Sequence, residues 1–371
     1  MSTDSADKPV DFRSLKSGGR VMQPIQGDVL SEDLAEQEIE VSVICPFYNE
    51  EKIVGSAIHS LLDHLESELD TSWELIVVND GSKDDSVKVA EEIAADHPKL
   101  RLLSYRHNRG RGHALRTGIA QARGSVIVTT EIDLSWGEDI VERLLAAMRE
   151  HPDADIVVAS PHLPGGGYKN VPFKRVFLSR FGNHVVRALM SDAATMNTGM
   201  TRAYRREAIQ SLPLHENGKE FHLEVILKAQ ALGYRIEEIP ALLEWKNYKH
   251  KGKRVKRKSS SKVNKLMVTH SLFSLFAQPI RYIWPLSALS MFAAGGFLVT
   301  GIIRLFMSLV SVYMLIVALA FALISMLLFI FGVLTQQGSM LQVEVWRLKQ
   351  DLVRTRSRDK DQSKGGAPKS L

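Results

Sequence analysis

An alternation of strands and helices begins with the stretch Val41-Ser42-Val43-Ile44-Cys45-Pro46. Its apolar and β-branched residues are typical of a buried strand, and Pro46 is expected to end that strand. Residues 50–69 then carry apolar side chains three and four positions apart, which predicts an amphipathic helix. A buried strand followed by such a helix is the repeating unit of parallel α/β sheets.

The same unit recurs along residues 74–159. The pattern predicts strands over 74–78, 100–105, 125–130 and 155–159, separated by helices over 84–96, 113–122 and 138–150. We therefore expect an α/β domain with a Rossmann-like, mixed but mainly parallel sheet covered by helices on both faces. Ligands bind such sheets at the carboxyl ends of the strands, so the candidate site lies in the loops after Cys45, Val78, Tyr105 and Thr130.

Two uncharged apolar runs occupy the C-terminal part of the chain. Residues 283–303 form a run of 21 residues and residues 305–335 a run of 31, with Arg304 between them. About 20 apolar residues in a helix cross the hydrocarbon core of a bilayer. We predict a hairpin of two transmembrane helices. The alternative, two core helices of a soluble domain, is disfavoured because adjacent charge-free runs of this length are rare in such domains.

Basic residues flank the predicted hairpin on both sides. Residues 246–265 contain ten lysines and arginines and no acid, and residues 347–360 are again basic. Both ends of a hairpin lie on one side, and cytoplasmic loops are enriched in lysine and arginine, so we expect the α/β domain and both termini to be cytoplasmic. Residues 263–280 predict an amphipathic helix at the membrane surface. The basic block lacks an RNA-binding signature, so it is expected to contact membrane phospholipids and not nucleic acid.

The N-terminal residues and the single cysteine show where the folded part begins and exclude sites that need several cysteines. Residues 1–38 lack periodicity and the apolar core of a signal peptide, which predicts a disordered arm. The single cysteine, Cys45, excludes a disulfide within the chain and a cysteine-rich metal site, and it fits a reducing compartment. The expected order of parts after the arm is the α/β domain at 39–245, a juxtamembrane segment at 246–281, two membrane helices at 282–335, and a cytoplasmic helix with a basic tail at 336–371.

Polar and charged residues gather in the loops at the predicted strand ends. The first loop reads Pro46-Phe47-Tyr48-Asn49-Glu50, and the second reads Asn79-Asp80-Gly81-Ser82. A carboxylate at a strand end can accept hydrogen bonds from a nucleobase or ribose, although the second loop alone also fits a simple turn with a helix cap. The third loop reads His107-Asn108-Arg109-Gly110-Arg111-Gly112-His113. Its glycines allow backbone to approach an anion, and its arginines favour a diphosphate.

The fourth loop reads Glu131-Ile132-Asp133-Leu134-Ser135. Two carboxylates separated by one residue at a strand end can together hold a Mg²⁺ or Mn²⁺ ion that bridges phosphates. On its own, the motif fits a pair of solvated acids equally well.

Taken in order and spacing, the four loops resemble those of family 2 glycosyltransferases, nucleotide-sugar enzymes with the GT-A fold. The resemblance covers about residues 41–262. More narrowly, the chain resembles polyprenyl-phosphate hexose synthases such as dolichyl-phosphate mannose synthase and the bacterial undecaprenyl-phosphate glucosyltransferases. The hairpin behind a basic segment is similar to that of their two-helix members. The segments that carry the narrower resemblance are residues 175–180, 197–206 and 221–224.

The resemblance implies inverting transfer of a hexose from a UDP- or GDP-linked sugar to a polyprenyl phosphate at the cytoplasmic membrane face. It implies that Glu131, Asp133 and Ser135 bind the metal, with Asp133 and Arg111 in catalytic roles. Glu131 departs from the family's usual aspartate; it keeps the charge but reaches further. The residues implied to contact the nucleotide-sugar are Pro46, Phe47, Tyr48, Glu50, Asp80, Gly81, Ser82, Asn108, Gly110, Arg111, Gly112 and Ile132.

On the acceptor side, Ser160-Pro161-His162 replaces the family's usual Ser-Arg-Tyr after the fifth strand and removes an expected arginine. His162, Arg180, Arg202 and Lys246 are alternative substitutes. A lipid phosphate is already an anion, so the chemistry needs positioning and neutralisation of the leaving diphosphate more than a general base. The residues implied to bind the acceptor phosphate are Arg175, Ser179, Arg180 and Arg202.

Two other functions stay open from the sequence. A family 2 transferase acting on another lipid or a growing polysaccharide would share the donor loops, although processive synthases usually carry a Gln-x-x-Arg-Trp block that this chain lacks. A non-catalytic nucleotide-sugar-binding scaffold would keep the fold, but the retained Asp80, Arg111 and Asp133 favour an enzyme. A C-terminal helix that forms a homo-oligomer or returns to the membrane surface is predicted by the spacing of Leu341, Val345, Leu348 and Leu352.

Overall fold

The described part of the chain covers the α/β domain and the two long C-terminal helices. The predicted arm at residues 1–38, most of the basic and amphipathic segment, and the predicted site residues Arg175 and Lys246 lie outside it. The computed structural model describes residues 39–173, 176–177, 179–180, 195–196, 199–245, 249–250, 253–254, 279–307 and 312–365.

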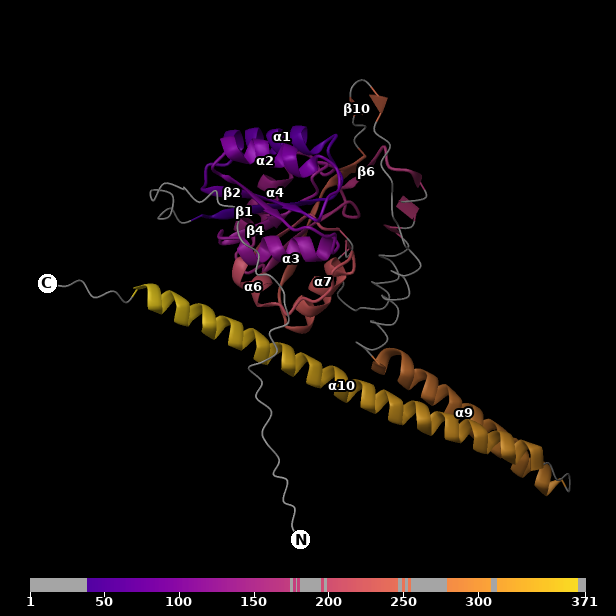
Figure 1. Ribbon diagram of the computed structural model, residues 1–371. Helices are drawn as coiled ribbons and strands as arrows, with labels where there is room; N and C mark the ends of the chain where they lie inside the picture. Colours follow the sequence, from indigo (N-terminus) through magenta and orange to yellow (C-terminus); the bar gives the residue numbers. More distant parts are fainter. Residues whose placement is uncertain are drawn as a thin grey trace, which may run out of the picture. The chain divides into compact units, whose positions relative to one another are not determined.

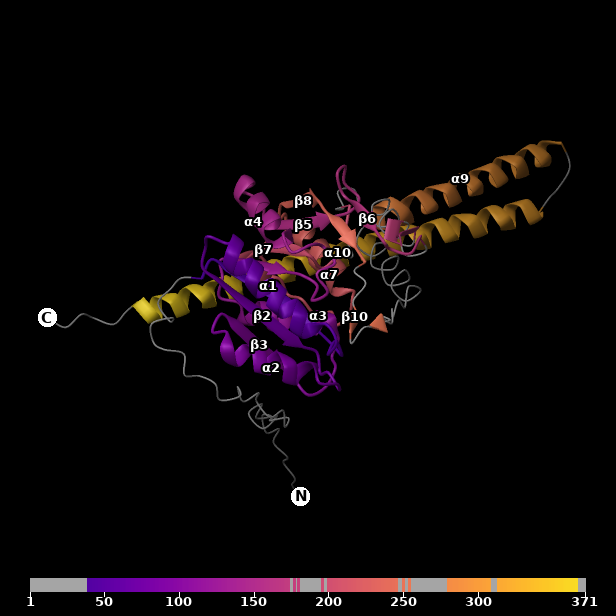
Figure 2. The same ribbon diagram turned by 90° about the horizontal axis from the view of Figure 1, so that it is seen from above.

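A seven-stranded sheet forms the centre of the α/β domain, with strand order β3-β2-β1-β4-β7-β5-β8 (Figures 1 and 2). Strands β1 to β4 pair in parallel, as do β5 and β8, whereas β7 runs antiparallel between β4 and β5. The predicted mixed, mainly parallel sheet is therefore confirmed. Its strands are β1 (Val41–Phe47), β2 (Trp73–Asn79), β3 (Leu100–Ser104), β4 (Val126–Thr129), β5 (Ile156–Ser160), β7 (Arg202–Arg205) and β8 (Ile236–Pro240).

Helices cover both faces of this sheet. In Figure 1, α1 and α2 lie above the sheet, and α3 and α6 lie below it. Helix α1 shows why: its residues Val54, Ile58, Leu61 and Leu65 are three or four positions apart, and all are buried against the strands. The helices are α1 (Val54–Glu68), α2 (Ser86–Asp96), α3 (Arg111–Gln121), α4 (Ile140–Glu150), α6 (Arg206–Ser211) and α7 (Phe221–Ala231).

Strand β1 continues through Pro46 to Phe47, so the prediction that Pro46 ends it is wrong. The carbonyl of Ile44 bonds toward β4, where it accepts from Thr130 N at 3.0 Å. By the two-residue repeat of a strand, Pro46 faces the same side. Pairing with β4 has already ended at Ile44. The missing N–H of proline therefore breaks no bond between strands.

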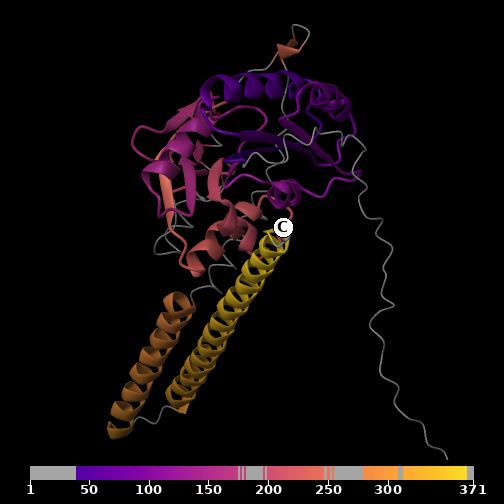
Figure 3. The same ribbon diagram turned by 90° about the vertical axis from the view of Figure 1, so that its left-hand side faces the viewer.

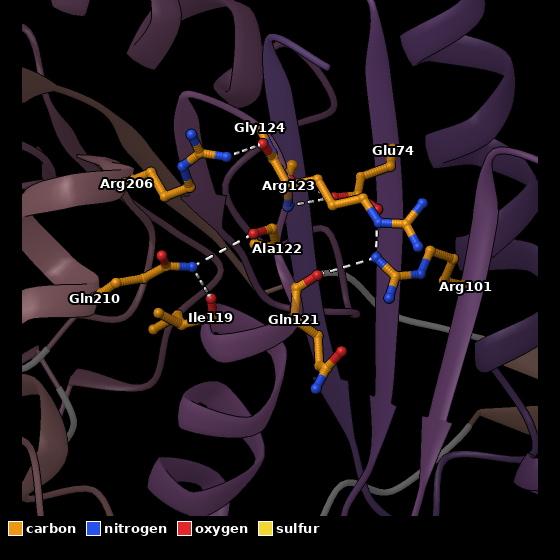
Figure 4. Close-up of polar contacts among 10 residues, drawn as sticks. Glu74, Arg101, Ile119, Gln121, Ala122, Arg123, Gly124, Arg206 and Gln210 are labelled. Carbon is orange, nitrogen blue, oxygen red and sulfur yellow. Dashed lines mark hydrogen bonds and ion pairs between the residues drawn. The ribbon is translucent and has the colours of Figure 1, made fainter. Parts of the chain in front are cut away.

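Side chains from other elements cap the carboxyl end of α3 (Figure 4). Arg101 donates to the carbonyl of Gln121 at 3.0 Å, and Gln210 donates to that of Ile119 at 2.7 Å. Arg101 also pairs with the buried carboxylate of Glu74 at 2.7 Å. Donors at a helix C-terminus satisfy carbonyls that have no partner within the helix. The cluster fixes α3, whose other end starts in the third loop of the predicted site.

Two long apolar helices follow the α/β domain, α9 (Pro279–Phe306) and α10 (Val312–Gly365), and Figure 3 shows them side by side. Within Ile283–Phe306 and Val312–Leu352, the most apolar stretches of 18 residues have mean hydropathies of 1.9 and 3.0, and both helices are long and apolar enough to cross a membrane. Serines join the helices: Ser287 Oγ donates to the carbonyl of Ser325 at 2.9 Å, and Ser325 Oγ donates back at 2.8 Å. Small hydroxyl residues of this kind let apolar helices pack closely.

Helix α10 does not end where the apolar run ends. It continues without a break to Gly365, so the second predicted membrane helix and the predicted tail helix are one element. The two faces of this extension differ. Trp346 is half-buried and Gln350 is buried. The exposed face carries Leu341, Val345, Leu348 and Leu352.

Candidate active site

Reciprocal hydrogen bonds join the loops after β1 and β2. Asn49 N donates to Ser82 Oγ at 2.9 Å, and Lys83 N donates to Asn49 Oδ1 at 2.8 Å. Glu50 N donates to Ser86 Oγ at 2.8 Å, which ties the first loop to the start of α2. The two loops are therefore held together as one rim of the site.

The predicted first-loop residues differ in what they present to this rim. Tyr48 is 40% exposed, whereas Pro46 and Phe47 are buried within β1. Tyr48 is thus the aromatic side chain of this loop that can contact a ligand from the rim.

Asp80, at the end of β2, organises the third loop. Its carboxylate is 5% exposed and accepts hydrogen bonds from Tyr105 Oη at 2.7 Å, Asn108 Nδ2 at 2.8 Å, Arg109 N at 2.9 Å and Gly110 N at 3.0 Å. Burial and the Asp80 carboxylate together raise the pKa of Tyr105, which keeps its hydroxyl a donor. A carboxylate with this many donors shapes the loop around it.

Gly81 makes the contact between the second and third loops possible. Its φ of +68° lies in the left-handed region, and a Cβ there would overlap the backbone of His107 and Asn108. The close approach of the two loops thus depends on glycine at this position.

The amino end of α3 uses its backbone donors within the protein. Gly112 N donates to the carbonyl of Asn217 at 2.7 Å, and His113 N donates to the same oxygen at 3.2 Å. Gly110 N is bonded to Asp80. These glycine amides, expected to approach an anion, already have protein partners. What the loop offers to a diphosphate is therefore the half-exposed side chain of Arg111.

The fourth loop folds so that its polar side chains meet Arg111. Arg111 Nη1 lies 3.3 Å from Glu131 Oε1. Ser135 Oγ donates to Glu131 Oε2 at 2.8 Å, and Ser135 N donates to Asp133 Oδ1 at 3.1 Å. Ile132 is buried beneath the turn. The structure thus brings together the four residues predicted for the metal and for catalysis.

The carboxylates of Glu131 and Asp133 suit a divalent cation such as Mg²⁺ or Mn²⁺, which also binds phosphate oxygens of a substrate. Burial, with the nearby charge of Asp133, raises the pKa of the Cys45 thiol in β1. The described residues hold no cluster of three or more His, Cys, Asp and Glu side chains that could enclose an ion. Two carboxylates without a complete cage suit Mg²⁺ or Mn²⁺, since such ions are held by one or two carboxylates, waters and substrate phosphates.

Just after the carboxyl end of β5, Tyr168 in β6 (Gly167–Lys169) joins the predicted acceptor residues. Its hydroxyl lies 3.2 Å from His162 Nε2 and 3.1 Å from Ser179 Oγ. Burial raises the pKa of Tyr168, and the charge of Arg180 opposes this shift, so Arg180 is close by. Tyr168 was missed in the sequence because it follows a glycine run without a motif. The structure gathers these four side chains in one acceptor-side cluster.

Arg202, also predicted to bind the acceptor phosphate, lies in the core of β7. Its side chain is 0% exposed, and Nη1 donates to the carbonyl of His222 at 2.8 Å. Burial lowers the pKa of Arg202, and the charge of Glu238 partly offsets this. The guanidinium of Arg202 thus contacts the backbone of α7 at His222.

The part of the chain that carries the four loops is similar to one family of known proteins. Residues 42–212 match the family model described as Glycosyl transferase family 2. The glycosyltransferase AglD of Haloferax volcanii is 31% identical over 211 residues, which are 56% of this chain and 33% of that protein. Two dolichyl-phosphate beta-glucosyltransferases of Trichomonas vaginalis, ALG5C and ALG5A, are each 27% identical over 56% of this chain. The matches cover 64% and 66% of these two relatives, so the chain spans a third to just under two thirds of the relatives it matches.

Among solved structures, glucosyl-3-phosphoglycerate synthase from Mycobacterium tuberculosis, in complex with Mn²⁺, UDP and phosphoglyceric acid, is 20% identical. Its TM-score is 0.48, over 64% of this chain and 78% of that one. The family match itself begins in β1 and ends after α6, so it contains all four loops of the site. Over residues 42–212, this chain is thus similar to the proteins of glycosyl transferase family 2.

Proposed function

We propose that this chain transfers a hexose from a nucleotide-sugar to a polyprenyl phosphate at the cytoplasmic face of a membrane. The observation that carries the proposal is the convergence of Arg111, Glu131, Asp133 and Ser135 at one edge of the sheet, within a family 2 domain. The names of the two Trichomonas vaginalis relatives support a lipid phosphate as acceptor. Two helices long and apolar enough to cross a membrane support a lipid substrate.

The donor, a UDP- or GDP-linked hexose, occupies the edge formed by the first three loops. Tyr48 contacts the base from the rim, and Asp80 acts by holding Asn108 and the third loop in place. Arg111 points toward the carboxylates of the fourth loop, where it can pair with the diphosphate. Gly81 and Ser82 complete the wall through the turn that follows β2.

Glu131 and Asp133 would hold a Mg²⁺ or Mn²⁺ ion. When bound, the ion neutralises the charge that develops on the leaving diphosphate. Arg111 Nη1 lies 3.3 Å from Glu131 Oε1, within reach of the same site. Arg111 is therefore positioned to move from that carboxylate to a phosphate oxygen when the donor binds.

The acceptor phosphate contacts the cluster of His162, Tyr168, Ser179 and Arg180. Arg180 supplies the positive charge, and the Tyr168 hydroxyl can donate while it connects His162 with Ser179. Arg175, implied by the family resemblance, extends this group outside the described residues. Such a cluster replaces the arginine that Pro161 removes.

The reaction is a single displacement at the anomeric carbon. An acceptor phosphate oxygen forms the new bond to that carbon while the bond to the diphosphate oxygen breaks, so the configuration inverts. The electron pair of the broken bond leaves with the nucleoside diphosphate, whose charge Arg111 offsets. Since the acceptor oxygen is already anionic, no side chain needs to remove a proton.

The C-terminal hairpin anchors the domain in the membrane, with the basic residues near 246–265 on the cytoplasmic side in contact with anionic phospholipids. The exposed apolar face of α10 beyond the membrane offers a surface for a second copy of the chain, which is the basis for proposing a homo-oligomer.

The test uses membranes that contain the chain and a polyprenyl phosphate. Radiolabelled UDP- and GDP-hexoses are added to them one at a time. We expect the labelled sugar to enter a lipid from which mild acid releases it. We expect no labelled lipid when EDTA removes the metal. Label in a polymer or in diacylglycerol would favour another family 2 transferase. No product with any donor, alongside measurable nucleotide binding, would favour a scaffold and overturn the proposal.

A further inference from the structure

The cytoplasmic part of α10 contacts the glycosyltransferase domain through one face. Gln350 is 7% exposed, and its amide donates to the hydroxyls of Ser211 and Tyr234, which bond to each other at 2.8 Å. One helical turn earlier, the ring of Trp346 lies over Lys228, with the ammonium 5.0 Å from the ring centroid. Residues four apart lie on the same helix face, so Trp346 and Gln350 form one docking surface.

Lys228, beneath Trp346, belongs to a buried ion pair. Its ammonium lies 2.6 Å from Glu224 Oε1 and 2.5 Å from the carbonyl of Pro213. The carboxylate of Glu224 also accepts from His215 N at 2.9 Å and from Glu216 N at 2.8 Å. A buried ion pair is stable only when its charges and lone pairs are satisfied. Here those bonds tie the loop 213–216 to α7, and Trp346 covers the lysine with its ring.

The next residue of this loop reaches the donor side. The carbonyl of Asn217 accepts from Gly112 N at 2.7 Å and from His113 N at 3.2 Å. Its side-chain oxygen accepts from Arg116. A Cβ on Gly112 would lie 2.6 Å from the carbonyl of Glu216, so the first turn of α3 is packed directly against the loop. Arg111 begins that turn.

We propose that Trp346 and Gln350 are positioning residues for the donor diphosphate. Trp346 holds α7 at Lys228. Gln350 holds the end of α6 at Ser211, and it holds Tyr234 just after α7. The pair of Lys228 and Glu224 connects α7 through the loop 213–217 to the first turn of α3. The helix that anchors the chain thereby sets the place of Arg111. The inference rests on the proposed donor site, and it is independent of the identity of the acceptor.

The test compares Trp346→Ala and Gln350→Ala with Leu348→Ala on the same helix, where the side chain is 64% exposed. Affinity is measured by calorimetry for UDP and for GDP, each with Mn²⁺, on the full chain in detergent micelles. Both docking-face variants should weaken binding by about fivefold or more, the lower end of typical coupling between sites. Leu348→Ala should bind like the wild type, and Trp346→Phe, which keeps an aromatic ring over Lys228, should recover most of the loss.

Amide hydrogen exchange supplies a second readout that separates positioning from unfolding. In Trp346→Ala, exchange should accelerate at residues 111–116 and 213–218 while the strands of the sheet stay protected. Wild-type affinity and wild-type exchange in both docking-face variants would overturn the inference, as would a wild type that binds neither nucleotide. The wild type could also bind nucleotide, and the docking-face variants lose affinity as expected, while no hexose is transferred to polyprenyl phosphate. That result would overturn the proposed acceptor alone.

Discussion

Replacing Asp80 with asparagine exchanges one carboxylate oxygen for an amide nitrogen and perturbs five hydrogen bonds from four donor groups. One carboxylate oxygen accepts from Tyr105, Arg109 and Gly110, and the other from Asn108 and Gly110. If the new amide nitrogen replaced the oxygen that accepts from Asn108, it would face the side-chain nitrogen of Asn108. Asn108 cannot rotate its amide freely to compensate, because the same nitrogen donates to the Asp80 carbonyl at 2.9 Å.

The cost follows from the number and type of these bonds. A hydrogen bond to a charged group contributes about 1.5–3 kcal/mol and a neutral one about 1 kcal/mol. Losing the charged bond to Asn108 and weakening those that remain should lower the free energy of unfolding by about 3 kcal/mol. For a domain of this size, each kcal/mol shifts the unfolding midpoint by about 2–4 °C, so a fall of about 6–12 °C is expected.

Thermal unfolding of the full chain in detergent, at one fixed scan rate, measures this shift. Asp63→Asn, at an exposed position of α1, is the control and should stay within about 1 °C of the wild type. Binding of UDP and GDP should weaken in Asp80→Asn because the third loop loosens. An Asp80→Asn midpoint equal to that of Asp63→Asn would refute the conclusion that this carboxylate holds the loop.

Three further predictions concern single side chains. Asp133→Asn should lower turnover by about a hundredfold or more and leave the unfolding midpoint nearly unchanged. Asparagine keeps the oxygen that accepts from Ser135 N at 3.1 Å, but it loses the charge that binds the metal. Near wild-type turnover at saturating Mn²⁺ would contradict this role. Tyr168→Phe should raise the KM for polyprenyl phosphate by about three- to tenfold and leave nucleotide affinity unchanged, since the lost hydroxyl connects His162 with Ser179; equal KM values would count against the acceptor cluster. Burial, with the charges of Arg202, Arg111 and Lys219, lowers the pKa of His222 well below its ordinary value. The unfolded chain then binds a proton that the folded chain does not, so the free energy of unfolding should fall as pH drops below about 6.5, and this slope should be smaller in His222→Gln. Denaturant titrations between about pH 5 and 7 measure it, and an identical slope in both proteins would contradict the assignment.

Much of the sheet was predictable because its strands are local apolar runs. Strands β1 to β5 follow from short continuous apolar runs, and the helices between them from a period of 3.6 residues; neither pattern needs knowledge of the fold. Strand β7 does not: Arg202-Ala203-Tyr204-Arg205 has no apolar run, and only its neighbours β4 and β5 make it a strand. The path of β1 beyond Pro46 likewise depends on where β4 ends.

The composition of the site was predictable, whereas its internal bonding was not. The rule that ligands bind at strand ends selects the loops with Asp80, Arg111, Glu131 and Asp133. It cannot show that the carbonyl of Asn217, distant in the sequence, accepts hydrogen bonds from the backbone amides at the start of α3. For the same reason the burial of Arg202 could not be foreseen, since its partner is the carbonyl of a residue on α7. Long-range partners decide which predicted residues remain available to a ligand.

The transfer of labelled hexose to lipid tests the central claim most directly. The full chain and its Asp133→Asn variant are each given labelled UDP- or GDP-hexose, Mn²⁺ and either a polyprenyl phosphate or the corresponding polyprenol. We predict label in the phosphate-bearing lipid alone, formed by the wild type, abolished by EDTA and reduced by about a hundredfold in the variant. Equal labelling of the polyprenol, or equal labelling by the variant, would contradict it.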